Sequence, residues 1–384
     1  MVSSAASQRS LVCTNREVGF DMTRQCISSR RGLCCIVLLC LFSIGAPAWA
    51  QFETRSTTAL AHPACAISAA DFNHDGNQDA AVALNSNEIQ VILGNGDGTF
   101  RPPVSYLSGD GVNWVATGVL TASGNSDIIV ANRLSNFVSL LLGNGDGTFQ
   151  AARTLSTPAA PSFAAIGDFN GDQIPDILVV DSPYISVLLG KGDGTFKPPR
   201  NTALSYTAVA AGVGDFDGDG TLDLAVNSAL RGTNAVVILL GNGDGTFRQT
   251  VKYEFGATVD APVVADFRGN GDLDLAVAEP LAGDVLILLG NGDGTFGEPT
   301  TYHPSSFVAG VMAGDFNGDG KLDLAAAEAN PSGAGILLGN GDGTFRVSTY
   351  SILPVKTHAM QRRQISTVTG RWILRSQMTA AWEA

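Results

Sequence analysis

One unit of about 49 residues recurs along this chain, and that repeat limits the possible folds more than any other feature. The heptapeptide GNGDGTF, once written GKGDGTF, recurs at 94–100, 143–149, 190–196, 241–247, 290–296 and 339–345. Between copies, a segment resembling GDFNGDGxLDLAV precedes an apolar run that ends in LLG. A unit of this length holds about four strands of 5–6 residues with their turns. The sequence therefore predicts an all-β fold, a β-propeller with six recognisable blades.

The composition favours strands over helices. The 384 residues include 45 glycines, 45% are apolar, and we find no helical period after residue 50. Alternation at Leu222, Leu224 and Val226 predicts a strand. A calcium-binding β-helix is the competing repeat fold, but its glycine motifs follow one another in tandem, whereas here the motif comes once per unit. We expect one domain over residues 51–355, with repeats at about 52–99, 100–148, 149–195, 196–246, 247–295 and 296–344.

Residues 1–50 have the pattern of an export signal. Arg30 and Arg31 precede the apolar run GLCCIVLLCLFSIG, and Ala48-Trp49-Ala50 is a small-x-small cleavage pattern. The run is shorter than the roughly 20 residues of a membrane-spanning helix. We therefore predict a secreted, periplasmic or cell-surface protein with no membrane span in its mature chain; Met22 is an alternative start.

Charge and cysteine content exclude two classes of protein. The formal net charge is −13, and loss of residues 1–50 would make it more negative, so nucleic acid is not an expected partner. Five of the six cysteines lie in the predicted signal, which leaves Cys65 alone and no disulfide framework. We interpret Cys65 as a small buried apolar residue. An acidic exported chain attracts cations.

The aspartate segment of unit 4 has the ligand pattern of a calcium loop. Counted from Asp215, carboxylates fall at positions 1, 3, 5 and 9, with Gly220 at 6 and the carbonyl of Thr221 at 7. Ca²⁺ takes hard oxygen ligands at such alternate positions around a sharp-turn glycine. An EF-hand would continue to an acidic residue at position 12. Turn formation alone explains the Asp and Gly content but not the fixed spacing. A catalytic carboxylate pair would not need a copy per blade, and a phosphate would be repelled.

Five units carry the pattern, and we name each loop by its unit. Their predicted ligands are Asp71, Asn73, Asp75, Asn77 and Asp79 in loop 1; Asp168, Asn170, Asp172, Ile174 and Asp176 in loop 3; Asp215, Asp217, Asp219, Thr221 and Asp223 in loop 4; Asp266, Asn270 and Asp274 in loop 5; and Asp315, Asn317, Asp319, Lys321 and Asp323 in loop 6. Position 7 contributes its backbone carbonyl. These loops predict about four to five Ca²⁺ sites.

The five loops are not expected to bind equally. Charge predicts that loop 4 binds most tightly, followed by loops 1 and 6 and then loop 3. In loop 3, Gln173 replaces the turn glycine, which costs on the order of 1 kcal/mol if φ is positive there. In loop 5, Arg268 occupies position 3 and either replaces the metal or points to solvent. Unit 2 retains only Asp127. We interpret GNGDGTF as a hairpin turn and its Phe as a core residue between blades.

The motifs GDFNGDGKLDLA and LLGNGDGTF resemble those of the FG-GAP and VCBS repeat families, whose propeller also forms the head of integrin α subunits. The resemblance covers residues 52 to 345, although the Phe that ends the glycine turn is followed by Gly only at Phe296-Gly297. It implies a propeller whose loops bind calcium at the matched positions. It does not imply a ligand, because the family includes adhesins, spacers and polysaccharide-active enzymes.

The tail at 356–384 departs from the repeat. One period beyond Asp315 a seventh aspartate loop should begin, but the chain has Gln364-Ile365. Codons built from the third base of each codon and the next two bases would permit an aspartate loop there, and the Trp372–Ile373 junction forces Asp. We hypothesise a frameshift, natural or from sequencing, that makes this tail a disordered or scrambled remnant of blade seven.

Three functional classes remain open from the sequence. The favoured one is an exported, calcium-stabilised propeller that binds a protein or carbohydrate ligand without catalysis. The alternatives are a polysaccharide lyase or hydrolase on the same scaffold, or a structural spacer or truncated remnant. The four histidines form no local motif, so no catalytic residue is proposed.

Overall fold

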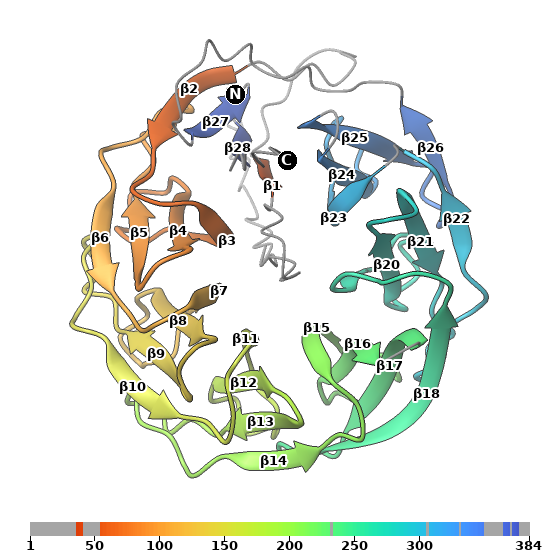
Figure 1. Cartoon of the computed structure of the whole chain (residues 1–384), viewed down its shortest axis with the longest axis horizontal. Coiled ribbons are helices and arrows are strands. Elements are labelled where there is room, and N and C mark those ends of the chain that lie inside the picture. Colours follow the sequence, from red (N-terminus) through yellow and green to blue (C-terminus); the bar gives the residue numbers. More distant parts are fainter. Residues whose placement is uncertain are drawn as a thin grey trace, which may run out of the picture.

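The computed structural model describes residues 36–40, 54–230, 233–304, 307–329, 332–348, 364–368 and 371–375. Six four-stranded antiparallel sheets stand around a central axis as the blades of a propeller (Figure 1). The predicted all-β fold is confirmed. The described residues include no helix, and hence none long and apolar enough to span a membrane.

The strands follow one another in chain order within every blade. Blade 1 contains β3 (Ala64–Ala70), β4 (Asp79–Leu84), β5 (Glu88–Ile92) and β6 (Val104–Leu107). Blade 2 contains β7 (Val112–Gly118), β8 (Asp127–Asn132), β9 (Phe137–Leu141) and β10 (Arg153–Ser156). Blade 3 contains β11 (Phe163–Gly167), β12 (Asp176–Asp181), β13 (Tyr184–Leu188) and β14 (Arg200–Ala203).

The second half of the propeller repeats this arrangement. Blade 4 contains β15 (Ala208–Gly214), β16 (Asp223–Leu230), β17 (Thr233–Gly241) and β18 (Phe247–Phe255). Blade 5 contains β19 (Val263–Ala265), β20 (Asp274–Glu279), β21 (Asp284–Leu288) and β22 (Thr300–Tyr302). Blade 6 contains β23 (Val308–Gly314), β24 (Asp323–Ala329), β25 (Ser332–Gly339) and β26 (Phe345–Ser348).

This strand order determines where the motifs lie. The first strand of each blade is innermost and the fourth is on the rim, as β3 and β6 show (Figure 1). Because the strands are antiparallel, the loop between strands one and two lies at the same edge of the disc as the turn between strands three and four. The aspartate loops and the GNGDGTF turns therefore share one edge, which we call the loop edge. The hairpins between strands two and three lie at the opposite edge.

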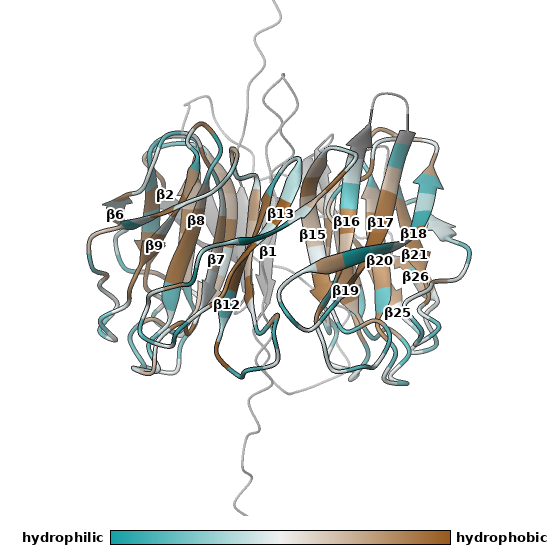
Figure 2. Ribbon diagram, turned by 90° about the horizontal axis from the view of Figure 1, so that it is seen from below, coloured by the Kyte–Doolittle hydropathy of each residue, from teal (hydrophilic) through white to brown (hydrophobic). Residues whose placement is uncertain are grey.

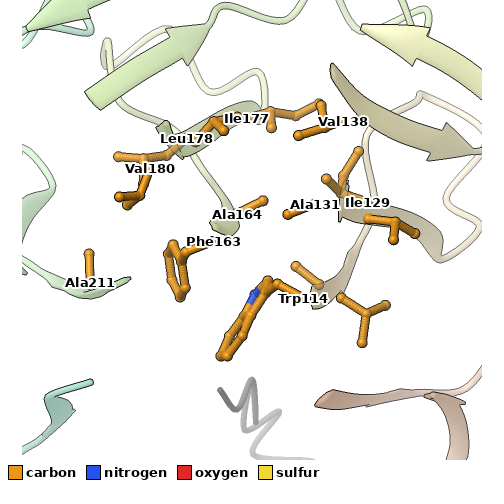
Figure 3. Packing of buried hydrophobic residues seen from close by; sticks show 14 of the residues in the cluster. Trp114, Ile129, Ala131, Val138, Phe163, Ala164, Ile177, Leu178, Val180 and Ala211 are labelled. Atoms are coloured by element: carbon orange, nitrogen blue, oxygen red, sulfur yellow. The ribbon is translucent and has the colours of Figure 1, made fainter. Parts of the chain in front are cut away.

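The core lies between the blades. Every residue of β4, β8, β12 and β20 is buried, because alternate side chains of these strands pack against the two neighbouring blades. Figure 2 shows the strands of the disc coloured mainly as apolar. Between blades 2 and 3, the rings of Trp114 and Phe163 lie 4.7 Å apart (Figure 3). Burial on both faces explains why the middle strands are continuous apolar runs in the sequence. Cys65 is buried, as predicted.

A seventh sheet lies between blades 6 and 1 (Figure 1). Its order is β1 (Ile36–Cys40), β28 (Arg371–Arg375), β27 (Gln364–Val368) and β2 (Thr54–Ala59). β1 falls inside the predicted export signal, and β27 and β28 fall inside the predicted remnant. The rest of both segments lies outside the described residues, so signal cleavage and the frameshift stay predictions.

Candidate functional site: the aspartate loops

The five aspartate loops occupy equivalent positions at the loop edge. They connect the first and second strands of blades 1, 3, 4, 5 and 6. Each loop carries its own predicted ligands, and the loops remain separate because each belongs to a different blade. The structure therefore contains five candidate loops rather than one combined site. Among the described residues, only loop 4 brings three carboxylates together, and Asp219 is not one of them.

Loop 4 brings three carboxylates to one point. One oxygen each of Asp215, Asp217 and Asp223 lies within 4.8 Å of the other two. Two oxygens that bind the same Ca²⁺ at about 2.3–2.6 Å can be at most roughly 5 Å apart. The three carboxylates therefore fit a single Ca²⁺, and loops 1, 3 and 6 have Asn in place of Asp217.

The aspartate at position 1 shapes the loop through its own backbone. In loop 4, Asp215 Oδ1 accepts the N–H of Gly218 at 2.8 Å and Oδ2 accepts that of Gly220 at 2.9 Å. The equivalent position-6 bonds to Asp71, Asp168 and Asp315 are 2.7–2.8 Å long. The aspartate at position 5 accepts the N–H of position 7, which is Asn77, Ile174, Thr221 or Lys321. The same scaffold is thus built in loops 1, 3, 4 and 6. Loop 5 has the equivalent backbone bonds, with Asp266 at position 1 and Asn270 as the acceptor at position 5.

The aspartate at position 9 has a second task that sequence reasoning missed. Asp223 Oδ2 accepts the N–H of Phe216 at 2.8 Å, and Oδ1 accepts the N–H of Gly241 at 2.7 Å. The same pair of bonds occurs in all six blades, at Asp79, Asp127, Asp176, Asp223, Asp274 and Asp323. Each of these carboxylates fastens the aspartate loop to the turn of its own blade. The survival of Asp127 in unit 2, without the other aspartates, was the sequence signal for this role.

These position-9 carboxylates are fully buried. Burial raises the pKa of Asp223 to about 6, against the two N–H bonds that lower it; Asp217 and Asp215 raise it further. Burial likewise raises the pKa of Asp79 and of Asp323 to about 6. A carboxylate in this environment is stabilised by a nearby cation.

Backbone conformation confirms the predicted constraint on position 6. Gly220 has φ of 86° and Gly218, at position 4, has φ of 71°. Gln173 holds φ of 63° at position 6 of loop 3, and His74 holds 57° at position 4 of loop 1. The backbones of both residues adopt the left-handed conformation that favours glycine, so loops 1 and 3 are strained relative to loop 4.

Loop 5 has a different interior. The guanidinium of Arg268 points inward: Nη2 donates to Asp274 Oδ1 at 2.7 Å and to the carbonyl of Gly290 at 2.6 Å. Its Nε donates to Asp274 Oδ2 at 3.4 Å, and Asp272 lies 3.9 Å from Nη2. Of the two interpretations of Arg268, the structure supports an internal cation.

Aromatic contacts connect loops 1, 3, 4 and 5 to the next blade. The position-2 Phe of loop 4, Phe216, packs edge-on against Phe296 of the blade 5 turn, with ring centroids 5.4 Å apart. Its carbonyl accepts the N–H of Gly294 at 2.9 Å. Phe72–Phe149, Phe169–Phe247 and Phe267–Phe345 form equivalent ring pairs. An ordered loop therefore supports the joint between two blades.

The GNGDGTF segments are turns, as predicted. Asn242 N–H bonds the carbonyl of Thr246, and Asp244 Oδ1 accepts the N–H of Thr246, each at 2.9 Å. The aspartate of each turn is thus used within the turn. The terminal residues Phe149, Phe247, Phe296 and Phe345 are buried between blades.

The opposite edge holds a buried acid that the sequence did not reveal. Asp181 ends β12 and is fully buried, and the hydroxyl of Ser186 donates to both of its oxygens at 2.9 and 3.1 Å. Burial raises its pKa to about 7. Other blades have Asn132 or Glu279 at this position, so no repeated pattern marks it.

The sequence of the propeller matches a described family. The model of the FG-GAP-like repeat matches five times, at residues 71–122, 120–179, 168–226, 228–277 and 266–326, which together span more than half of the chain. The chain belongs to the FG-GAP-like repeat family. The matched segments include aspartate loops 1, 3, 4, 5 and 6. No curated protein sequence matches the chain significantly.

Solved structures of low sequence identity share the fold. An Agrocybe aegerita lectin, described for recognition of non-reducing terminal N-acetylglucosamine, gives a TM-score of 0.53 at 21% identity, covering 76% of this chain and 79% of that one. The BP39L lectin of Burkholderia pseudomallei gives 0.57 at 16% identity, covering 75% and 84%. BBS1N in complex with ARL6DN gives 0.51 at 14% identity, covering 84% and 96%. These similarities show the propeller fold alone.

Proposed function

We propose that this FG-GAP-like protein is an exported, calcium-stabilised propeller that binds a protein or glycan without catalysis. The observation that carries the proposal is the common scaffold of loops 1, 3, 4 and 6, each of which presents oxygen ligands at a joint between blades. Calcium would supply positive charge to these loops. The role of the sites is to order the propeller rather than to perform chemistry.

The chain's own residues explain how such a site would stabilise the fold. In loop 4, Asp215, Asp217 and Asp223 would hold the ion, because their oxygens converge there. Asp223 also holds Phe216 and Gly241 by hydrogen bonds, and the ring of Phe216 packs on Phe296 of blade 5. Neutralising the carboxylates would remove their mutual repulsion while these bonds remain. The joint between blades 4 and 5 would become firmer.

A binding role is supported by what the propeller neighbours do and by the opposite edge. Two of the structural neighbours are lectins, and a third was solved in complex with a protein. The three most exposed large apolar side chains of the described residues, Leu107, Leu134 and Leu281, are 71–79% exposed. They lie at a strand end or in hairpins of the edge opposite the aspartate loops. We propose this edge as the surface that contacts the ligand.

The proposal is tested first by thermal unfolding of the purified protein in excess calcium and after chelation. A large upward shift of Tm with calcium is expected, because a ligand of the folded state stabilises it by mass action. An unchanged Tm would show that the loops are ordinary turns. Export is tested separately by mass spectrometry of the secreted chain, which should begin at Gln51.

The ligand class requires a second assay. A glycan array and a screen of extracellular proteins should give a signal that Leu134→Ser and Leu281→Ser reduce without lowering Tm. Breakdown of a polysaccharide by the protein would instead establish the enzymatic alternative.

A further inference from the structure

The interior of loop 5 already contains a positive charge. The side chain of Arg268 is 22% exposed, and its guanidinium lies against Asp274, whose side chain is fully buried. In loop 4 the residue at this position is Asp217, which points its carboxylate toward Asp223. The two loops therefore place opposite charges at the same position of the same scaffold.

We infer that Arg268 takes the place of the metal ion in blade 5, so that this joint of the propeller is held without calcium. The inference rests on the proposed calcium role of the other loops. It gives the propeller a permanently ordered joint beside joints that depend on the ion. Asp266, Asn270 and Asp274 then serve the loop's own hydrogen bonds instead of a metal site.

The contacts of the guanidinium support this inference. A planar guanidinium can donate along two sides of a carboxylate, and Arg268 uses Nε and Nη2 on the two oxygens of Asp274. Nη2 also reaches the carbonyl of Gly290 at 2.6 Å, in the turn of blade 5. One side chain thus neutralises the buried acid and fastens the loop to the turn.

Blade 2, the other blade without a full set of ligands, shows a related solution. Asn125, at position 7, donates from Nδ2 to the carbonyl of Gly143, which is the equivalent of Gly290. Within the described part of the chain, no side chain donates to this glycine carbonyl in blades 1, 3, 4 and 6. A side-chain N–H therefore reaches the carbonyl in the two blades that lack the metal pattern.

The side chain of Arg268 is also held in place by the next blade. A Cβ added at Gly343, in the turn of blade 6, would lie 3.2 Å from Cγ of Arg268. The stem of the arginine therefore packs beneath that turn. A group confined in this way loses less entropy when it binds Asp274 than a freely exposed arginine would.

The first test counts bound calcium by metal analysis after equilibrium dialysis. The protein should bind four ions, and Arg268→Asn, which restores the residue of loops 1, 3 and 6, should bind five. Arg248→Asn is the matched control: Arg248 lies 4.0 Å from Asp217 but is half exposed, and its loss should leave four. Five ions in the unmodified protein, or four ions both in it and in Arg268→Asn, would overturn the inference.

The second test works in the absence of calcium. Hydrogen exchange in chelator should show the amides of Phe267 and Gly290 protected, with faster exchange at Phe216 and Gly241 of loop 4. Arg268→Asn should raise exchange at Phe267 and Gly290 at least tenfold in chelator, and Arg268→Lys should give a smaller rise without adding an ion. Unchanged protection in Arg268→Asn would contradict the inference, whether or not the protein binds calcium. A protein that binds no calcium would defeat only the calcium role proposed for the other loops.

Discussion

Loops 4 and 5 belong to adjacent blades and share one backbone scaffold, yet they treat the same buried carboxylate differently. Asp223 and Asp274 each accept two backbone N–H groups, and both are fully buried. Asp223 faces two further carboxylates, whereas Asp274 faces a guanidinium. The comparison shows that position 3 of this loop can carry either charge, and that in blade 5 a residue of the chain places a cation against the buried acid.

The largest expected effect is the response of the whole protein to calcium. Four sites at a free calcium 100-fold above Kd would stabilise the fold by on the order of 10 kcal/mol, at about 2.7 kcal/mol per site. Asp215→Ala should remove about a quarter of this response, because it disables loop 4. Asp266→Ala should leave the response whole, because loop 5 holds Arg268. Denaturant unfolding in calcium and in chelator measures both, and an equal loss in the two variants would erase the distinction between the loops.

Asp127 extends the comparison to a loop with neither ion nor arginine. Asp127→Ala leaves the N–H groups of Leu120 and Gly143 without their acceptor and should cost about 2–5 kcal/mol. The cost should be the same in calcium and in chelator. Asp127→Asn, which retains one acceptor oxygen, should cost less, and a calcium-dependent cost measured by urea unfolding would show that blade 2 binds metal after all.

Asp181 adds to the comparison with Asp223 and Asp274 a buried acid that accepts a hydrogen bond from the hydroxyl of Ser186. Its folded-state pKa of about 7 lies above its unfolded value. The folded state therefore retains the proton longer than the unfolded state, and stability falls as pH rises from about 4 to 7, by up to about 1.4 kcal/mol per pH unit. Asp181→Asn should lose this slope and be the more stable protein at pH 8. The test is the difference in the free energy of unfolding between the two proteins, measured in urea at pH 5 to 8 in saturating calcium. A difference that does not change with pH would refute the prediction.

The smallest expected effect concerns the backbone of loop 3. Gln173→Gly should raise stability by about 0.5–1 kcal/mol, because glycine adopts the positive φ of this position without strain. His74→Gly in loop 1 should gain less, since His74 Nε2 also bonds Asn125 Oδ1 at 3.1 Å. Thermal unfolding compares the two, and a loss of stability in Gln173→Gly would mean that the glutamine side chain makes a favourable contact.

Much of the fold and the outline of the site could be predicted from the sequence. The repeat of GNGDGTF predicted the propeller, and the spacing from Asp215 to Asp223 placed their oxygens in one loop. The positive φ at Gln173 followed from its place in the pattern. The second role of the position-9 aspartates did not follow. The backbone N–H groups that donate to them from the turn, such as that of Gly241, are distant in sequence and meet the carboxylates only when the blade forms.

The sequence by itself determined the architecture and the local loops, because a short repeat fixes each blade through neighbouring strands and near contacts. Tertiary structure decided the contacts between segments that are distant in the sequence. It turned Arg268 toward Asp274 and Gly290, packed Phe216 on Phe296 of the next blade, and buried Asp181 at the opposite edge. It also assigned the strand after each GNGDGTF turn to the blade before it, since strand pairing, and not the phase of the repeat, defines a sheet. These outcomes depend on burial and on distances between remote residues, which residue spacing along the chain does not encode.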